Sequence, residues 1–377
     1  MTPSPGFLVT ILSFLACIGP LIFIHELGHY FVGRWFGVKA ETFSIGFGRE
    51  VAGWTDKRGT RWKIGWLPLG GYVKFKGDMN PASQPSPEWL SLPAEERAQT
   101  FQAKPVWQRF LIVVAGPFTN FLAAILLFMG IFAAIGYPTS PALVTAIVEN
   151  SPAAEAGILP GDRITGIDGK HIRNFAEVRE YVMLRPSERM SVTVEREGQE
   201  LRLPLTSGTD IARDSFGNEA KIGTLGVYSN ALELEKLPVT ELPGEAVRQT
   251  WTSLQQMVVA LGQFISGDRS VKELGGPLKI AQISGQQASL GWLPFFWLMA
   301  VISINLGFIN LLPIPLLDGG HLLFYSIEGI RRKPIRPETQ EWAFRTGLAA
   351  LLALMIFVTF NDLASFGLWN RLGGLIG

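Results

Sequence analysis

Four stretches of the chain are apolar and carry no charge. They cover residues 7–23, 110–135, 290–317 and 346–360, and the first continues through a polar interruption to Phe36. A helix needs about 20 mostly apolar residues to cross a bilayer, so the pattern predicts about four transmembrane helices. No Lys or Arg precedes the first run and no small-residue cleavage pattern ends it. We therefore interpret it as a retained helix, not as a signal peptide.

The chain between the first two apolar runs has a different pattern. Residues 38–76 alternate apolar and polar positions and are interrupted by glycines, which is typical of short strands and hairpins. The same stretch is rich in aromatic residues, which favour the membrane–water interface. We predict a membrane-associated β region here, followed by a connector over residues 80–93, where Pro and Ser are frequent.

The stretch between the second and third apolar runs predicts a soluble module. Residues 143–148 are strand-like, residues 175–183 have a helical pattern, and residues 190–196 and 200–205 pair naturally as a hairpin. This order, and above all the run 151–169, resembles a PDZ domain, which binds an extended peptide as an added strand. In bacterial versions the carboxylate-binding strand comes last, which makes Thr224, Leu225, Gly226 and Val227 the candidate groove. Alternatively, these residues only close the small sheet.

Composition agrees with a membrane protein. Only 17% of the 377 residues are charged, against about 25% in an average soluble chain. The 33 basic and 32 acidic side chains nearly cancel, so nothing points to a nucleic-acid partner. A single cysteine, Cys17, excludes an internal disulfide framework and a cysteine-cluster metal site.

The distribution of Lys and Arg predicts the orientation. Residues 34–109 hold 12 basic and 7 acidic side chains, and residues 318–345 hold 5 and 4, whereas residues 137–292 hold 15 and 19. Basic connections favour the cytoplasmic side, so the module and both termini are expected to be extracytoplasmic.

The predicted fold class is therefore a polytopic α-helical membrane protein with a membrane-associated β-hairpin region and one inserted extracytoplasmic PDZ domain. Residues 243–265 repeat apolar positions at helical spacing and predict an amphipathic helix on the membrane surface or on the module. The predicted parts are the first transmembrane helix (1–36), the cytoplasmic-side β region and connector (37–106), the second transmembrane helix (107–136), the PDZ domain (137–229), the amphipathic segment (230–289), and the third and fourth transmembrane helices (290–377).

A candidate metal motif lies at the end of the first apolar run, as His25-Glu26-Leu27-Gly28-His29. Residues four apart share a helix face, so both imidazoles can bind one ion. A catalytic zinc with two His ligands needs a third protein ligand and keeps a position for water. Glu26 is placed to take a proton from that water. Such residues in a membrane helix are costly unless paired or functional, which favours a metal centre over a buried polar cluster.

The third ligand is expected from residues 310–321. Asp318 is the only carboxylate between Trp292 and Tyr325, and Pro313 and Pro315 break the helix before it. We predict Asp318 as the ligand, with His321 as its competitor or neighbour. The alternative for Asp318 is an ordinary helix cap at the interface, and for Asn310 a helix-breaking residue before the prolines.

Together these features resemble the site-2 protease family of intramembrane zinc metalloproteases, and within it the bacterial regulator-of-sigma-E protease branch. The shared motifs are His25 to His29, the Asn-x-x-Pro-x-Pro-x-x-Asp-Gly sequence that starts at Asn310, segments 67–73 and 115–121, and the PDZ module. The best-known pattern of that branch has two PDZ modules, whereas this sequence has one.

The resemblance implies one zinc ion per chain, held by His25, His29 and Asp318, with Glu26 as the catalytic base. It also implies a bacterial inner-membrane location, and substrates that are single-pass membrane proteins, such as trimmed anti-sigma factors and remnant signal peptides. The implied substrate-binding residues are Asn310, which would hold the substrate backbone, and Gly70, Gly71, Tyr72 and Val73, in a hairpin region that engages the substrate as an extended strand.

Two other functions compete with an endopeptidase. A non-catalytic metal-binding scaffold would recruit C-termini through the PDZ module, and it would need the metal ligands but not Glu26. A transporter would predict repeated halves with broken helices, and the sequence has no such repeat. The sequence therefore favours a zinc endopeptidase.

Overall fold

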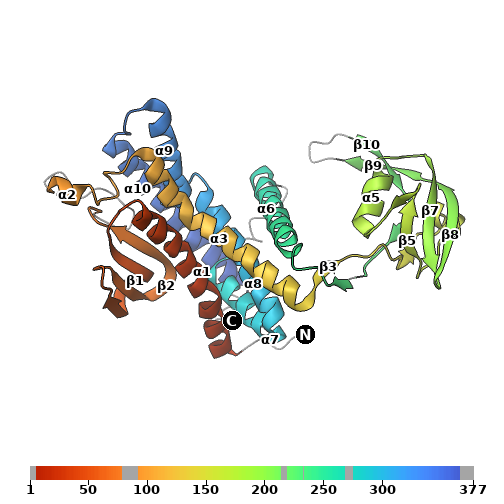
Figure 1. Cartoon of the computed structure of the whole chain (residues 1–377), viewed down its shortest axis with the longest axis horizontal. Helices are drawn as coiled ribbons and strands as arrows, with labels where there is room; N and C mark the ends of the chain where they lie inside the picture. The colour runs from red at the N-terminus through yellow and green to blue at the C-terminus, as the bar shows by residue number, and fades with distance from the viewer. Residues whose placement is uncertain (1–5, 79–91, 214–218, 232, 268–274, 366–377) are drawn as a thin grey trace, which may run out of the picture. The chain divides into compact units, whose positions relative to one another are not determined.

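The computed structural model describes residues 6–78, 92–213, 219–231, 233–267 and 275–365. The chain forms two compact units, one comprising Met1–Ile131 with Thr240–Gly377 and the other Phe132–Val239. Figure 1 shows the elements of both. The first unit contains α1 (Phe7–Trp35), β1 (Ala40–Thr55), β2 (Arg61–Phe75), α2 (Ala94–Arg97), most of α3 (Val106–Ile135), α6 (Leu242–Ser266), α7 (Pro277–Leu290), α8 (Trp292–Leu311), α9 (Asp318–Arg331) and α10 (Pro337–Ser365).

Four of these helices are long and apolar enough to cross a membrane, namely α1, α3, α8 and α10. They correspond to the four uncharged runs of the sequence. Within the third run, α8 ends at Leu311, just before Pro313 and Pro315, which were predicted to break the helix. The chain turns after Leu311 and starts α9 at Asp318.

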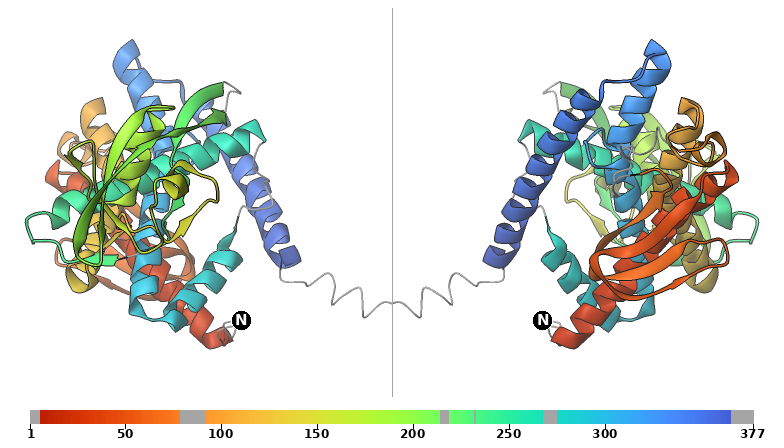
Figure 2. Two further views of the ribbon diagram at one scale, coloured as in Figure 1. Left: turned by 90° about the vertical axis from the view of Figure 1, so that its right-hand side faces the viewer. Right: turned by 90° about the vertical axis from the view of Figure 1, so that its left-hand side faces the viewer.

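The strands β1 and β2 form the predicted hairpin. Some residues of β1 pair with two residues of β2, which the alternation of apolar and polar positions does not predict. Thr42 lies opposite both Lys74 and Arg61, and Phe43 opposite both Val73 and Trp62. The beginning of β1 therefore lies between the two ends of β2, and the right-hand view of Figure 2 shows these long bent strands. Among the described strands, residues 71–75 pair with β1 alone, and the Phe75 N–H donates to the Asp78 carboxylate at 3.2 Å.

An aromatic core holds the hairpin against the helices. Tyr30 of α1, Phe43 of β1 and Phe75 of β2 are buried with Leu322 and Tyr325 of α9. The Phe43 ring stacks on Trp62 with 4.3 Å between centroids. Burial of such rings is the main favourable term for packing outside the lipid, and here it fixes α1, β2 and α9 around one point.

Helix α7 packs beside α1 and α8 and is anchored by α10. The Asp362 carboxylate of α10 accepts hydrogen bonds from the backbone N–H groups of Gly276 and Lys279, at 3.0 Å each. A carboxylate at a helix N-terminus satisfies free N–H groups and suits the helix dipole. This contact joins the last apolar helix to the bundle.

The second unit is the inserted α+β module. Its elements are β3 (Tyr137–Thr139), β4 (Ala146–Ile147), α4 (Pro152–Glu155), β5 (Arg163–Ile167), β6 (Lys170–His171), α5 (Phe175–Met183), β7 (Arg189–Arg196), β8 (Gln199–Thr206), β9 (Gly208–Arg213), β10 (Glu219–Thr224), β11 (Val227–Tyr228) and β12 (Glu233–Glu235). The strand order β6-β5-β7-β8 makes its main sheet, and β11 pairs with β4. It has its own core, which includes Val144, Ile164, Val178 and Val192.

The four apolar helices, the hairpin and the inserted α+β module confirm the predicted polytopic α+β fold class, and the extracytoplasmic side of the module stays a prediction. Several boundaries differ from the expected ones. Strand β12 pairs with β3, so the module extends to about residue 239 instead of ending at 229. The segment 230–289 holds two helices, α6 and α7, because Gly267 in the left-handed conformation ends the first. The expected connector 80–93 lies almost wholly outside the described residues.

Candidate metal centre

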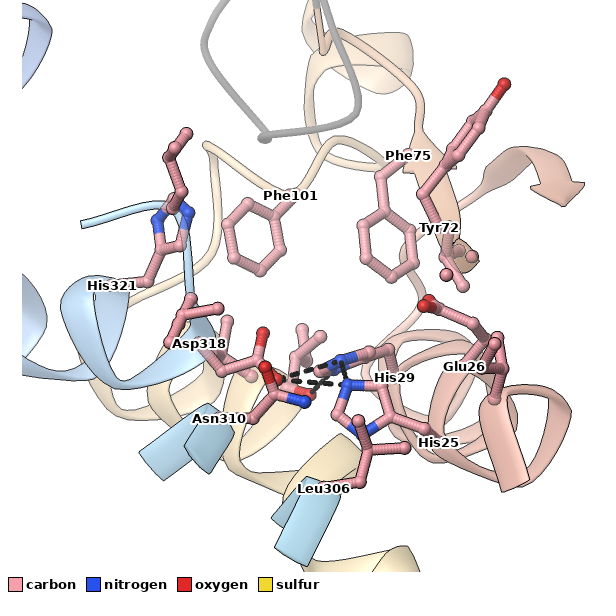
Figure 3. A pocket seen from close by; sticks show the side chains of 18 of the residues that line it. His25, Glu26, His29, Tyr72, Phe75, Phe101, Leu306, Asn310, Asp318 and His321 are labelled. Carbon is pink, nitrogen blue, oxygen red and sulfur yellow. Dashed lines mark hydrogen bonds and ion pairs between the residues drawn. The ribbon is translucent and has the colours of Figure 1, made fainter. Parts of the chain in front are cut away.

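The two histidines of the motif lie one turn apart on α1, and both point to the same place. Their Nε2 atoms are 3.3 Å apart, and the His25 and Glu26 side chains are buried, each residue being 7% exposed. The spacing of four residues on a helix produces this arrangement directly. Figure 3 shows both rings in one cavity.

Asp318 reaches the same point from the first turn of α9. Its Oδ2 atom lies 3.1 Å from Nε2 of His25 and 3.5 Å from Nε2 of His29. The two following glycines allow this approach. A Cβ on Gly320 would lie 2.5 Å from the carbonyl oxygen of Ile314, and a Cβ on Gly319 would overlap the carbonyl oxygens that end α8. The Asp-Gly-Gly sequence therefore lets α9 start directly against the preceding turn.

A third helix, α3, supports the histidines from behind. The His29 Nδ1 atom lies 2.9 Å from the carbonyl oxygen of Ile112, and the His25 Nδ1 atom lies 3.0 Å from the side-chain amide of Asn120. A Cβ on Gly116 would overlap the rings of both histidines. Because Gly116 has no side chain, both histidine rings can pack against α3 at this position.

The three side chains fit a zinc ion. One ligand atom from each of His25, His29 and Asp318 can be chosen so that all lie within 4.8 Å of one another. A tetrahedral zinc with bonds of about 2.0–2.1 Å separates its ligand atoms by roughly 3.4 Å, and the three distances here are 3.1, 3.3 and 3.5 Å. Asp318 Oδ2 is buried and lies within ion-pair distance of both histidines. Two imidazoles with one carboxylate are a catalytic zinc set that leaves a fourth position open.

Glu26 lies on the other side of the histidines from Asp318, next to strand β2 (Figure 3). A Cβ on Gly71 would lie 2.8 Å from Cγ of Glu26, 2.8 Å from the Ser44 carbonyl oxygen and 2.9 Å from Cγ2 of Ile22. Only glycine allows β2 to pass this close to α1. The proposed proton acceptor and the backbone of β2 at Gly71 are thus neighbours.

One cavity of about 420 Å³ contains most of the predicted site. Besides the metal motif, its lining includes every residue predicted to bind substrate in the membrane, namely Gly70, Gly71, Tyr72, Val73 and Asn310. Asn310 lies in the last turn of α8, one residue before its end. The rings of Phe75 and Phe101, which the sequence did not single out, stack in its wall at 5.6 Å between centroids.

His321, the competing ligand, lines the same cavity but is not part of the cluster of possible metal ligands found among the described residues. Its ring packs on Phe344, with 5.1 Å between centroids, and faces Tyr325. The geometry therefore favours Asp318 over His321 as the third ligand.

The predicted peptide groove belongs to the other unit. Leu225, Gly226 and Val227 line a separate cavity of about 710 Å³ within the module, together with residues of α5 such as Val178 and Arg179. Val227 starts β11, whereas Thr224 ends β10 and Leu225 is a core residue. The short strand next to the groove is therefore Val227–Tyr228.

The residue that sequence reasoning missed is Asn120. It was part of a shared segment, 115–121, without a role. A polar amide within a long apolar run is the signal that could have found it, since such groups are costly in a membrane without a partner.

Comparison with known proteins identifies the family of the chain. The model of peptidase family M50 matches residues 13–354. A protein from Agrobacterium fabrum named as a candidate zinc metalloprotease is 45% identical over 96% of this chain and 98% of its own length. The metalloprotease MmpA of Caulobacter vibrioides is 36% identical over 98% of this chain and 99% of its own. The chain belongs to peptidase family M50, which confirms the resemblance to the site-2 proteases.

Solved structures resemble part of the chain. The PDZ domain of an SdrC-like protein from Listeria innocua is 21% identical and covers 26% of this chain and all of its own, with a TM-score of 0.19.

Proposed function

We propose that this protein is an intramembrane zinc endopeptidase that cuts single-pass membrane proteins, with one zinc ion per chain held by His25, His29 and Asp318. The observation that carries the proposal is the convergence of three ligand atoms, at the spacing of a tetrahedral zinc, beside the buried Glu26. The zinc metalloprotease names of the relatives support the choice of metal.

A zinc ion held by His25, His29 and Asp318 would supply Lewis acidity, which would polarise a peptide carbonyl and acidify water. Glu26 acts as the general base. Its carboxylate takes a proton from the attacking water and returns it to the leaving amine nitrogen, so that water is added across the peptide bond. The buried cavity limits competing water and strengthens the electrostatic interactions within it.

Strand β2 binds the substrate next to Glu26. Peptide groups of a transmembrane helix are hydrogen-bonded internally, so the helix must unwind before it can be cut. Strand addition to residues 70–73 stabilises the unwound form, and the backbone of Gly71 lies against Glu26. Asn310, with one amide donor group and one acceptor, holds the substrate backbone from the other wall of the cavity.

The module selects substrates. Leu225, Gly226 and Val227 line a groove beside α5 that suits an extended peptide or a C-terminus. The charge distribution supports an extracytoplasmic module and termini, and the family match supports a bacterial inner-membrane location. Trimmed anti-sigma factors and remnant signal peptides are the substrates that the family resemblance favours.

The test is cleavage of a tagged single-pass substrate by the purified full-length protein in detergent. We expect Glu26→Gln to lose at least about 100-fold in rate, since a general base contributes about 10²–10⁴-fold, and to keep its zinc. Glu341→Gln is the matched control, because Glu341 is exposed on α10 and pairs with Arg345 at the surface. Equal rates for wild type and Glu26→Gln would contradict the proposal. Zinc in both proteins with no cleavage by wild type, across several substrates, would favour the scaffold.

A further inference from the structure

Both histidines of the centre have a hydrogen-bonding partner on α3. His29 Nδ1 faces the carbonyl oxygen of Ile112 at 2.9 Å, and His25 Nδ1 faces the amide of Asn120 at 3.0 Å. Ile112 and Asn120 are eight residues apart and therefore lie on the same side of α3, about two turns from each other. Helix α3 thus provides the hydrogen-bonding partner of Nδ1 in both rings.

The protonation state of Nδ1 decides whether a histidine can bind a metal through Nε2. A neutral imidazole carries one proton, so Nε2 has a free lone pair only when Nδ1 is protonated and donates a hydrogen bond. The Ile112 carbonyl can only accept, which fixes His29 in the metal-binding form. His25 needs an acceptor in the same way.

The amide nitrogen of Asn120, which is a donor, faces His25 Nδ1 in the structure. With that orientation Nδ1 would be unprotonated, and the proton would sit on Nε2, directed at Asp318. Amide oxygen and nitrogen have nearly the same shape, and their assignment follows from the hydrogen-bond network. Asn120 Oδ1 is buried and has no hydrogen-bond partner among the described residues.

We propose that Oδ1 of Asn120 accepts the Nδ1 proton of His25, which makes Asn120 the positioning residue that keeps His25 in its metal-binding form. In this orientation the Asn120 amide is rotated so that Oδ1 and Nδ2 exchange places, and Nδ2 instead of Oδ1 lacks a partner. Because one amide atom lacks a partner in either orientation, the need of His25 Nδ1 for an acceptor decides between them. This inference rests on the proposed zinc ligation by His25.

The surroundings of Asn120 fit this role. The residue is completely buried, and the side-chain hydroxyl of Ser303 on α8 donates to its backbone carbonyl oxygen at 2.7 Å. This bond ties the backbone of α3 to α8 at the level of the amide. Burying an amide in an apolar environment without a hydrogen bond is costly, so its contact with His25 gives a reason for an asparagine at this position.

The test compares zinc affinity, measured by chelator competition on the purified full-length protein, for Asn120→Leu and Asn120→Asp. Leucine has about the size of asparagine but accepts no hydrogen bond, so we expect its dissociation constant for zinc to rise about 10- to 100-fold. Aspartate cannot act as an amide donor but accepts well, so its affinity should stay near that of wild type. Ser284→Ala is the control, since it removes another buried hydroxyl, which bonds to the Ile280 carbonyl on α7.

The cobalt-substituted proteins give a second measurement. The visible absorption of Co²⁺ should be the same in wild type and Asn120→Asp and should change in Asn120→Leu. Unchanged zinc affinity in Asn120→Leu would overturn the inference, as would an equal loss in both variants. If Asn120→Leu does not fold, zinc retention in Asn120→Asp supports the inference and its loss overturns it. A wild type that binds no zinc contradicts the proposed function itself.

Discussion

Two glycines allow neighbouring backbone to lie directly against the proposed catalytic side chains. Gly116 of α3 faces both histidine rings, and Gly71 of β2 faces Glu26. In each case the added methyl group of an alanine would collide with a buried neighbour that packing holds in place. The geometry of the centre therefore depends on small residues that take no part in the chemistry.

Gly71→Ala tests this dependence. The new Cβ would lie 2.8 Å from Glu26 Cγ and from the Ser44 carbonyl oxygen, so β2 must move away from α1. Because a misplacement of about 1 Å can cost about 100-fold in rate, we expect kcat/KM to fall at least about tenfold while zinc content is unchanged. Gly130→Ala on α3 is the control, since its Cβ meets nothing within 4 Å. A Gly71→Ala variant as active as wild type would contradict the close fit.

At the residue scale, the sequence predicted the side chains whose spacing or isolation is distinctive. His25 and His29 share a helix face by their spacing, and Asp318 is the only carboxylate in its region. The support from α3 could not be predicted, because Ile112 acts through its backbone carbonyl and any residue has one. Asn120 carried a weak signal, since polar side chains occur singly in many membrane helices.

At the scale of elements, a bidentate ion pair holds the end of β7 to the turn before β5. Arg196 donates to both carboxylate oxygens of Asp162 at 2.7 Å, and Asp162 Oδ2 also accepts from the Leu159 N–H at 2.8 Å. Arg196 further donates to the Gly157 carbonyl oxygen. This pair links the loop 157–162 to the main sheet of the module.

Asp162→Asn should therefore destabilise the module at pH 7, by about 1–3 kcal/mol for the loss of a charged hydrogen-bonded partner. Hydrogen bonds from Arg196 lower the pKa of Asp162. The stabilisation is thus fully present above the pKa of an unfolded aspartate, about 3.9, and is lost as the pH falls through the lower folded value.

Scanning calorimetry of the full chain checks both statements. The difference in the melting temperature of the module between wild type and Asp162→Asn should be large at pH 7 and should shrink below about pH 4. Glu233→Gln, which breaks the exposed pair with Arg163, should change stability by less than about 1 kcal/mol. A difference for Asp162→Asn that grew on acidification would contradict the assignment.

The sequence predicted most elements but few of their pairings. The helix at residues 175–183 and the hairpin that follows appear as expected, because periodicity and turn residues are local signals. The pairing of β1 with both ends of β2, and the pairing of β3 with β12, depend on contacts between segments that are distant in the sequence. Local patterns carry no information on such contacts.

At the scale of the whole molecule, the two compact units divide the proposed work between them. The candidate centre lies in the first unit, and the candidate peptide groove lies in the second. The module enters and leaves through the paired strands β3 and β12, in which Thr139 lies opposite Glu233. An insertion that begins and ends at one pair of strands can be removed without changing the sequence of the rest.

Replacing residues 140–232 by Asn-Gly, a sequence that favours a two-residue hairpin turn, tests this division. We expect the shortened protein to bind zinc as wild type does and to cut a different set of substrates. Zinc content and cleavage of a panel of tagged single-pass proteins would be measured on the same samples. A folded variant without zinc would contradict the division of labour, as would an unchanged substrate profile.

The central claim is that residues from α1 and α9, nearly 300 positions apart in the sequence, hold one zinc ion. The most direct measurement is X-ray absorption at the zinc edge, with metal stoichiometry, on wild type and Asp318→Ala. The account predicts one zinc per chain with two imidazole ligands and a carboxylate oxygen, and loss of zinc or of that oxygen in the variant. An identical zinc environment in Asp318→Ala, or a wild type whose zinc lacks the two imidazoles, would contradict it.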